Sequence, residues 1–353
     1  MNRFVYASHP VRVVFGRGTV AAVPEEVERL RLSRVLIVTT RSSAATAEAV
    51  AKALGPRAAA IFPGAVMHTP VAVTETAMQL VAETGADGVV AIGGGSVTGL
   101  GKAIALRTDM PQIVVPTTYA GSEMSPILGE TRDGQKVTQS SEAIRPEVVV
   151  YDVDLTLGLP PALSGTSGIN ALAHAVEALY APDRNPIVAL MAVEAIAALH
   201  RALPALVRDP RDVAARTDAL YGAWLSGVCL GSVSMALHHK LCHTLGGSFD
   251  LPHAETHTAV LPHALAYNAP AVPEAMARLA GVLGADPARA LWDLAGAVGA
   301  KRALADLGMP ADGIALAAER ALARPYPNPR PLERAAIAAL IARAFAGEPP
   351  ESI

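Results

Sequence analysis

The feature that most constrains the fold is a change, near residue 151, in the secondary structure that the sequence predicts. Before it, short apolar runs rich in β-branched residues alternate with helical segments such as Ala44–Leu54, Val71–Thr84 and Thr98–Arg107. The runs are Val13–Phe15, Val35–Thr40, Ala58–Phe62, Gly88–Ile92, Ile113–Pro116 and Val148–Tyr151. Apolar strands separated by helices predict a parallel sheet covered on both faces, which binds ligands at the carboxyl ends of its strands.

After Tyr151 no further run has the character of a strand. Alanine-rich helical segments follow, beginning with Ser164–Ala178, Pro186–His200, Val213–Ser226 and Ser232–Leu245 and continuing to Ala346. The sequence therefore predicts a Rossmann-like α/β domain over residues 1–155, which binds a dinucleotide, and an all-α catalytic domain over 156–353.

Charge and composition narrow the class of protein. The formal net charge of the 353 residues is -3 and no basic run stands out, so nucleic acid is not an expected partner. No apolar stretch reaches about 18 residues and the N-terminus lacks the apolar core of a signal peptide, so we expect a cytoplasmic protein without a membrane partner. Cys229 and Cys242 form no CxxC pair and are expected to be reduced thiols.

A glycine-rich turn supplies the first chemical motif. Gly93, Gly94, Gly95 and Ser96 stand between the strand Gly88–Ile92 and a helix expected to begin near Thr98. Glycines let the backbone approach an anion closely, and a helix N-terminus offers free N–H groups. This context predicts pyrophosphate binding, although the motif is not the GxGxxG fingerprint of common Rossmann domains.

Further cofactor contacts are expected at neighbouring strand ends. The loop from Pro116 to Glu123 follows the next strand and offers Thr117, Thr118 and Ser122. Thr40 stands at the end of the second strand, where an acidic residue would hold the ribose hydroxyls and repel a 2′-phosphate. NADH and NADPH are therefore both expected as cofactors. Lys136 and Leu157 are also assigned to the cofactor site.

Histidines gather in one stretch of the helical half. Six of the ten lie between His238 and His263. His239 and His243 are four apart on a predicted helix and share a face, His253 follows in an expected loop, and Asn170 and His174 pair in the same way on an earlier helix. Side chains converging from two helices and a loop predict an active site.

At these residues the chain resembles the iron-containing alcohol dehydrogenase superfamily, from Val14-Phe15-Gly16 to Asn328–Pro331. The resemblance depends on the glycine motif up to Lys102, on Pro116–Glu123 and on Asn170–Glu177. It implies the fold of that superfamily, which dehydroquinate synthase shares, a nicotinamide cofactor and a homodimer.

Two departures separate this chain from metal-dependent members. Gly99 and Asn170 stand where those members carry aspartates. In those members the aspartate at the position of Asn170 is a metal ligand. The other ligand positions match His174, His239 and His253, and His243 matches a further active-site histidine. An amide removes the one anionic ligand of a divalent ion, so no metal is expected. This agrees with the maleylacetate-reducing branch, whose members work without iron and to which the resemblance is closest.

The implied reaction is reduction of the C=C bond of maleylacetate to 3-oxoadipate, in the breakdown of aromatic compounds. The substrate is a dianion, so the site needs donors for two carboxylates and for a developing enolate. His243 is the first candidate for the enolate donor. Tyr326, in a loop stiffened by Pro325 and Pro327, is the second. Lys240 is a candidate counter-charge, with a solvated helix position as its alternative.

Two other functions remain open. A metal-dependent alcohol or polyol dehydrogenase of the same superfamily is possible if Asn170 is tolerated as a ligand. A nucleotide-responsive binding protein without turnover is the remote alternative, against which the converging histidines argue, since binding alone needs no acid–base cluster.

Overall fold

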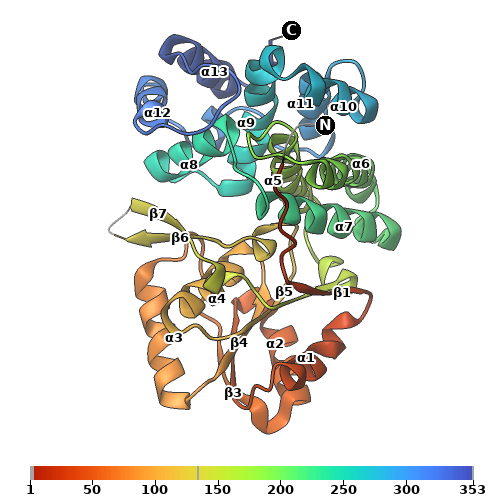
Figure 1. Cartoon of the computed structure of the whole chain (residues 1–353), viewed down its shortest axis with the longest axis vertical. Coiled ribbons are helices and arrows are strands. Elements are labelled where there is room, and N and C mark those ends of the chain that lie inside the picture. Colours follow the sequence, from red (N-terminus) through yellow and green to blue (C-terminus); the bar gives the residue numbers. More distant parts are fainter. Residues whose placement is uncertain (1–3, 133–134, 352–353) are drawn as a thin grey trace. The chain divides into compact units, whose positions relative to one another are not determined.

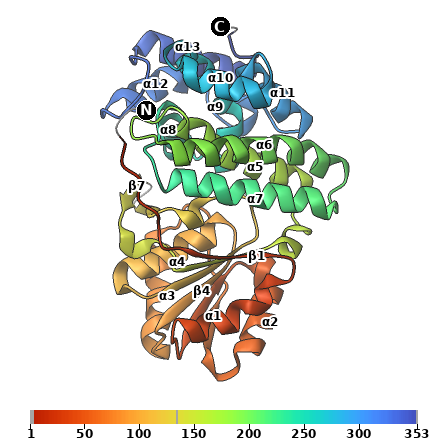
Figure 2. The same cartoon turned by 45° about the vertical axis from the view of Figure 1, so that its right-hand side comes forward.

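The computed structural model describes residues 4–132 and 135–351, except the side chains of residues 135 and 136. The chain forms two compact units (Figures 1 and 2). One is Ser8–Leu159, and the other is Pro160–Ile353 together with Met1–Ala7. Each is described by itself.

The first unit is built on a six-stranded sheet in which every neighbouring pair is parallel, in the order β1-β8-β5-β4-β2-β3. The strands are β1 (Arg12–Gly16), β2 (Val35–Thr39), β3 (Ala58–Phe62), β4 (Gly88–Gly93), β5 (Gln112–Pro116) and β8 (Val148–Asp152). All six predicted strands are confirmed, each within one residue of its expected ends.

Helices cover both faces of this sheet, as the apolar strands predict. They are α1 (Val23–Arg29), α2 (Ala44–Leu54), α3 (Val71–Thr84) and α4 (Gly95–Thr108). Short 3-10 helices are η1 (Thr19–Ala22), η2 (Arg41–Ser43), η3 (Gly55–Arg57), η4 (Ser122–Met124), η5 (Glu142–Ile144) and η6 (Val153–Thr156). Val27 of α1 and Val50 of α2 share a core with Ile92 of β4, whereas Gly101 of α4 lies against Ala91 on the opposite face. The two faces of β4 thus pack against different helices.

The register of the central strands sets the position of the glycine motif. Gly93 pairs with Pro116 at the ends of β4 and β5, so the loops that follow the two strands start at the same level. The Thr39 hydroxyl at the end of β2 donates to the carbonyl of Ile92, 2.8 Å away. Three strand ends that carry predicted cofactor residues therefore meet at one edge of the sheet.

A two-stranded antiparallel ribbon, which the sequence does not predict, consists of β6 (Ile127–Arg132) and β7 (Gln135–Ser140). Its strands are mostly polar, so they lack the continuous apolar run by which the other six were found. Within β6 only alternate positions are buried, and Leu128 packs against Ala103 and Ile144.

Among the described residues, the second unit is entirely helical, as predicted. Its helices are α5 (Pro161–Ala178), α6 (Pro186–Arg208), α7 (Val213–Leu230), α8 (Leu237–Phe249), α9 (His253–Asn268), α10 (Pro273–Leu283), α11 (Pro287–Ala297), α12 (Gly313–Leu322) and α13 (Arg334–Ala346), with η7 (Ala269–Ala271) and η8 (Ala305–Leu307). Helix α5 is buried over almost its whole length, so its polar residues face other helices rather than solvent.

Several helices extend beyond their expected ends, for example α6 to Arg208 and α7 to Leu230. Three further differences lie near the candidate site residues. Helix α4 begins at Gly95, not near Thr98, because Gly94 is extended and already acts as the N-cap. Helix α8 begins at Leu237 rather than Ser232, because the preceding turn is held by Asp183, which accepts from the backbone N–H of Ser234 at 2.9 Å. The third is His253, which was expected in a loop but is the first residue of α9, directly after Pro252.

Helix α6 is long and apolar enough to cross a membrane by length and composition alone. Half of its most apolar window is buried inside the protein, and it packs against α5 and α7. A single helix of this kind also occurs in the core of soluble proteins, so it is weak evidence for a membrane span.

Candidate active site

In the sheet-containing unit, the glycine motif forms a tight strand-to-helix connection. Gly93 has φ near +154°, and a Cβ placed there would lie 2.5 Å from Cγ2 of Val97. A Cβ on Gly94 would lie 3.0 Å from Cγ2 of Thr118. Side chains are therefore excluded from this turn by both backbone conformation and space.

The turn delivers backbone donors to the edge of the sheet. Gly95 and Ser96 open α4, so their N–H groups have no earlier helical carbonyl to bond. The helix dipole adds partial positive charge at the same point. Together these features form a suitable cradle for a pyrophosphate.

The loop after β5 lies against this turn. The N–H of Thr117 donates to the carbonyl of Gly93 at 3.0 Å, and Thr118 fills the space beside Gly94. The structure thus brings Thr117 and Thr118 to the glycine motif. Ser122 begins η4 further along the same loop and is half-buried.

The other predicted cofactor residues are more dispersed. Thr40 follows β2, which neighbours β4, and its hydroxyl lies 2.9 Å from that of Ser42. Leu157 follows η6 and is half-buried. Lys136 belongs to β7, but its side chain lies outside the described part of the structure.

A buried ammonium braces the loop after β5. The Nζ of Lys102 donates to the carbonyls of Ser125 at 2.7 Å and Ile127 at 2.9 Å, and also to that of Ser122. Burial lowers the pKa of Lys102 to about 7, and the nearby Glu123 carboxylate opposes that shift. Lys102 therefore ties α4 to the segment that carries Ser122.

Gly99, the first departure from the metal-dependent pattern, has a steric explanation. A Cβ at this position would overlap the hydroxyl of Thr69, which is buried and has a left-handed backbone with φ near 44°. An aspartate cannot occupy the space beside Gly99 while Thr69 stays in place.

In the helical unit, α5, α8 and α9 bring the predicted histidines together. The ring centroids of His174 and His239 lie 5.0 Å apart with the rings stacked. His239 and His243 are 6.3 Å apart, and His243 and His253 are 6.4 Å apart. We call these four residues, with the buried Asn170 one turn before His174, the histidine cluster.

Glu177 holds the histidine cluster in place. Its Oε2 lies 2.7 Å from Nδ1 of His239, and the same carboxylate accepts from the backbone N–H groups of Ala236 at 2.8 Å and His238 at 2.9 Å. It therefore fixes the N-terminus of α8 on α5. With Nδ1–H of His239 donating to Glu177, Nε2 presents a lone pair, and it has no hydrogen-bond partner within the described ranges.

The charge state of His174 follows from its burial. Desolvation first, and then repulsion from the neighbouring imidazoles, hold the pKa of His174 well below its usual value. His174 is therefore neutral at physiological pH. His253 is half-buried and His243 is exposed, so the cluster runs from the protein interior to solvent.

Tyr326 lies beside Lys240, which belongs to α8. The Lys240 ammonium is 5.7 Å from the centre of the Tyr326 ring. Burial first, and then the Glu177 charge, raise the pKa of Tyr326, so its phenol is neutral. The Oη atom is buried without a hydrogen-bond partner in the part of the chain that the structure describes. Tyr326 therefore offers a neutral hydroxyl that can donate a hydrogen bond to a ligand.

The donor set at the superfamily's metal positions contains no anionic ligand. It consists of the amide of Asn170 and three imidazoles, without a carboxylate, and Glu177 is engaged with the backbone and with His239. Among the described residues, only His238, Cys242 and His257 form a group of three His, Cys or carboxylate side chains with ligand atoms within 4.8 Å of one another. His174, His239 and His253 do not converge in this way.

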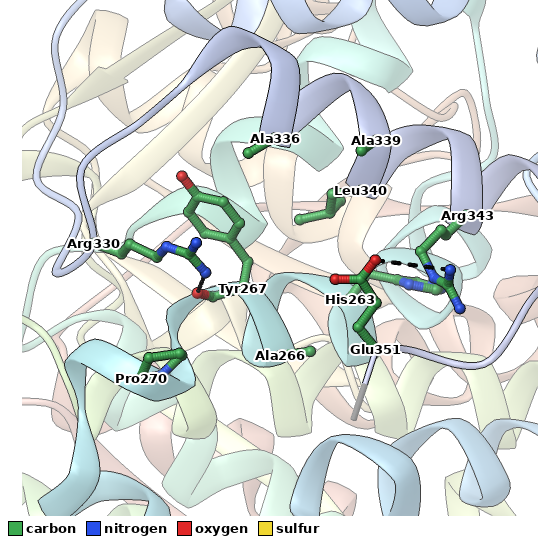
Figure 3. Close-up of a pocket in the computed structure, with 10 residues that line it drawn as sticks. All are labelled: His263, Ala266, Tyr267, Pro270, Arg330, Ala336, Ala339, Leu340, Arg343 and Glu351. Atoms are coloured by element: carbon green, nitrogen blue, oxygen red, sulfur yellow. Dashed lines mark hydrogen bonds and ion pairs between the residues drawn. The ribbon is translucent and has the colours of Figure 1, made fainter. Parts of the chain in front are cut away.

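A cavity of about 220 Å³ lies elsewhere in the helical unit, between α9 and α13 (Figure 3). It is lined by Arg330 and Arg343, but their charges have local partners. Arg330 donates to the carbonyl of Tyr267 at 2.8 Å, and Arg343 lies 3.8 Å from the Glu351 carboxylate (Figure 3). No residue of the histidine cluster lines it, so it is not part of the candidate active site.

Reasoning from the sequence did not identify Glu177, His238 or His257 as site residues. Glu177 lies seven residues after Asn170 and three after His174, so helical spacing places it on their face of α5. That spacing was the available signal. For His238 and His257, the sequence offered only their place in the histidine-rich stretch.

Family models match both halves of the chain. The model described as "Iron-containing alcohol dehydrogenase" matches residues 10–153, and the one described as "Fe-containing alcohol dehydrogenase family, C-terminal" matches residues 164–345. Two curated relatives, from Rhizobium sp. (strain MTP-10005) and Sphingobium indicum, are named "Maleylacetate reductase". Both are 56% identical to this chain and cover 99% of it, over 100% and 99% of their own lengths.

Solved structures agree with the family models. The maleylacetate reductase of Agrobacterium tumefaciens is 56% identical, with a TM-score of 0.95, over 99% of this chain and 100% of its own. A 1,3-propanediol oxidoreductase is 26% identical, with a TM-score of 0.91, over 98% of this chain and 100% of its own. The predicted fold class is thereby confirmed.

Proposed function

Because this chain belongs to the iron-containing alcohol dehydrogenase family and is a nicotinamide-dependent oxidoreductase, we propose that it reduces the C=C bond of maleylacetate to 3-oxoadipate. The observation that carries the proposal is the histidine cluster, in which Asn170 stands among imidazoles where the family carries an anionic metal ligand. Full-length similarity to proteins named maleylacetate reductase supports it.

The reaction places clear demands on the site. A bound reduced nicotinamide would supply a hydride to the alkene carbon beta to the ketone, and the π electrons of the substrate would then move onto the ketone oxygen as an enolate. A proton then reaches the alpha carbon and the ketone reforms. The protein must supply donors for two carboxylates, a donor for the enolate oxygen and one proton.

Residues of the helical unit match these demands. His243 lies at the exposed end of the cluster, where an imidazole can exchange protons with solvent, and we assign it as the enolate donor. Tyr326 is the second candidate because its phenol is neutral and its Oη is buried. Lys240 beside it supplies positive charge for a carboxylate. Glu177 keeps His239 in one tautomer and orientation.

Residues of the sheet-containing unit bind the cofactor in this proposal. The N–H groups of Gly95 and Ser96 receive the pyrophosphate, with Thr117 and Thr118 beside them. We include Ser122, Thr40, Lys136 and Leu157 as further contacts. Thr40 carries no charge against a 2′-phosphate, so the proposal includes both NADH and NADPH.

The proposal includes catalysis without a metal ion. The family as a whole is described as iron-containing, so this is a departure of the individual site. It depends on the donor set of Asn170, His174, His239 and His253, which gives a divalent cation no anionic ligand. Hydrogen-bond donors must then polarise the ketone in place of a Lewis acid.

A metal-dependent alcohol or polyol dehydrogenase is the second candidate. The similarity in fold to a 1,3-propanediol oxidoreductase favours it. We further propose that the protein acts in the cytoplasm as a homodimer, in the breakdown of aromatic compounds.

One assay separates the two functions. NADH oxidation at 340 nm is followed with maleylacetate, and NAD⁺ reduction with propane-1,3-diol, each before and after exhaustive chelation. We expect turnover of maleylacetate alone, unchanged by the chelator. Turnover of the diol as fast as that of maleylacetate, or activity lost to chelation and restored by Fe²⁺ or Zn²⁺, would favour the second candidate.

A further inference from the structure

Behind the histidine cluster lies a second pair of histidines that the proposed function does not use. His238 of α8 and His257 of α9 are both fully buried, with 0% of each side chain exposed. Nε2 of His238 and Nδ1 of His257 are 3.0 Å apart. Cys242, also buried, lies 3.8 Å and 3.9 Å from the two ring nitrogens of His238. The two rings therefore form a hydrogen-bonded pair inside the protein.

Both members of the pair are neutral. Burial first, and then the surrounding imidazoles, hold the pKa of His238 and of His257 well below the usual value. A neutral imidazole has one N–H and one lone pair. The hydrogen bond between the rings uses one of each, so the state of Nδ1 in His257 determines whether its Nε2 donates or accepts.

The Nε2 of His257 is the unsatisfied atom of the pair. It is fully buried and has no hydrogen-bond partner within residues 4–132 and 135–351. Leaving such an atom without a partner costs about 1–3 kcal/mol. The two nitrogens of the His257 ring point in different directions. Because Nδ1 faces His238, Nε2 is directed away from that hydrogen bond.

The surroundings of His257 indicate what Nε2 meets. The centroid of the His257 ring is 4.3 Å from that of His253, 5.1 Å from that of His239 and 6.5 Å from that of His243. His257 thus borders three members of the histidine cluster, among them His243, the residue assigned as the enolate donor. A lone pair directed toward a dianion would repel it, whereas an N–H would bind it.

We propose that His257 donates its Nε2–H to an oxygen of the dianionic substrate and that His238, by donating Nε2–H to Nδ1 of His257, fixes the tautomer that makes this possible. His257 is then a further substrate-binding residue and His238 a positioning residue. The inference rests on the proposed function, because it takes the substrate to be a dicarboxylate.

The test uses variants that separate shape from hydrogen bonding. His257→Phe keeps a ring but removes the donor, whereas His257→Gln places an amide N–H near the position of Nε2. His238→Phe and His238→Gln form the same pair for the positioning residue. Cys242→Ala is the matched control, because it alters the same buried group without removing a member of the hydrogen-bonded pair.

Two readouts are needed on each variant. The first is kcat/KM for maleylacetate with NADH. The second is calorimetric binding of adipate, a six-carbon dicarboxylate that cannot be reduced. His257→Phe should lower both by about 10- to 100-fold, the loss of one hydrogen bond to a charged group, and His257→Gln should recover most of that loss. His238→Phe should weaken both by a smaller factor and His238→Gln should recover it, while Cys242→Ala stays within about 3-fold of wild type.

The outcomes distinguish this inference from the function it rests on. A wild-type protein that does not reduce maleylacetate overturns the proposed function. A wild-type protein that does so, while His257→Phe binds adipate and turns over as well as Cys242→Ala, overturns the role of His257 alone. Equal losses in the Phe and Gln variants at either histidine would indicate a packing role and also overturn it. Stoichiometric zinc in wild type that is absent from His238→Gln would make the pair metal ligands instead.

Discussion

In the sheet-containing unit, the buried ammonium of Lys102 lies among the carbonyls of Ser122, Ser125 and Ile127. In the helical unit, buried imidazole nitrogens of His174, His239 and His257 have no hydrogen-bond partner in the described part of the chain. Single unsatisfied atoms occur in both units, including Oε2 of Glu123. Among the described residues, only those of the helical unit bring such atoms together on adjacent rings.

This difference separates two uses of a buried polar side chain. Proteins satisfy nearly all buried polar atoms, and a group that is fully satisfied from within stabilises the fold. Several unsatisfied atoms side by side carry a cost that the fold does not recover, so a ligand is the natural partner. Lys102 should therefore matter for stability, and the histidines for turnover.

The largest expected effect is on the free energy of unfolding, when Lys102 is replaced. Lys102→Met should lower the free energy of unfolding by about 3–5 kcal/mol, because it leaves several buried carbonyls without a donor. Urea unfolding measures the loss. Lys301→Met is the matched control, since Lys301 is exposed and donates to a single carbonyl, that of Asp306. Equal stability of the two variants would contradict a structural role for Lys102.

The next effect is on turnover. His243→Ala should lower kcat by about 10²–10³-fold, the usual result of losing one oxyanion donor, with NADH affinity and unfolding free energy little changed. Steady-state kinetics and NADH fluorescence titration test this. His200→Ala, at a half-buried histidine of α6 outside the cluster, is the control. Near wild-type turnover in His243→Ala would transfer the role to Tyr326.

A smaller effect is expected at the glycine turn. Gly93→Ala should weaken NADH binding by about 10-fold, because a Cβ there approaches Val97 and the backbone is strained by about 1–3 kcal/mol. Gly158→Ala, where a Cβ would meet nothing within 4 Å, should bind NADH as wild type does. If both variants bind NADH normally, the turn is not the pyrophosphate site.

Cofactor choice should show only a modest difference. With Thr40 uncharged, kcat/KM for NADH and NADPH should agree within about 10-fold, and Thr40→Asp should reduce the value for NADPH selectively. Measuring both cofactors on both proteins checks this. A wild-type enzyme for which NADPH is inert would refute the reasoning from Thr40.

For the removal of metal ions we expect no effect on activity. Exhaustive chelation should leave activity unchanged, and elemental analysis should find no stoichiometric iron or zinc, because the histidine cluster offers no anionic ligand. Loss of activity that Fe²⁺ or Zn²⁺ reverses would show that the unsatisfied imidazole nitrogens are ligands rather than hydrogen-bonding groups.

The sheet could be predicted from the sequence because its strands are buried on both faces and their apolar runs are continuous. The polar β6–β7 ribbon lacks that signal. Helical spacing correctly placed Asn170 with His174 and His239 with His243, since it depends only on the 3.6-residue period. His253 was expected in a loop, but Pro252 is the N-cap of α9 and His253 is its first residue.

What the sequence could not provide is the pairing between elements. Glu177 bonds to backbone groups 59 and 61 residues away, and no local pattern specifies such partners. Likewise, six histidines in one stretch do not indicate which rings contact the substrate and which lie behind them. That division depends on how α8 packs against α9.

The contact between Gly99 and Thr69 limits how this protein can change during evolution. Replacing Gly99 with the aspartate of metal-dependent relatives would drive its side chain into the Thr69 hydroxyl, so Thr69 must become smaller or move first. Thr69 is itself held in a left-handed conformation, and its carbonyl accepts from the N–H of Thr131 at 3.2 Å. An aspartate at Gly99 therefore requires a compensating change in a second segment, the one that carries Thr69.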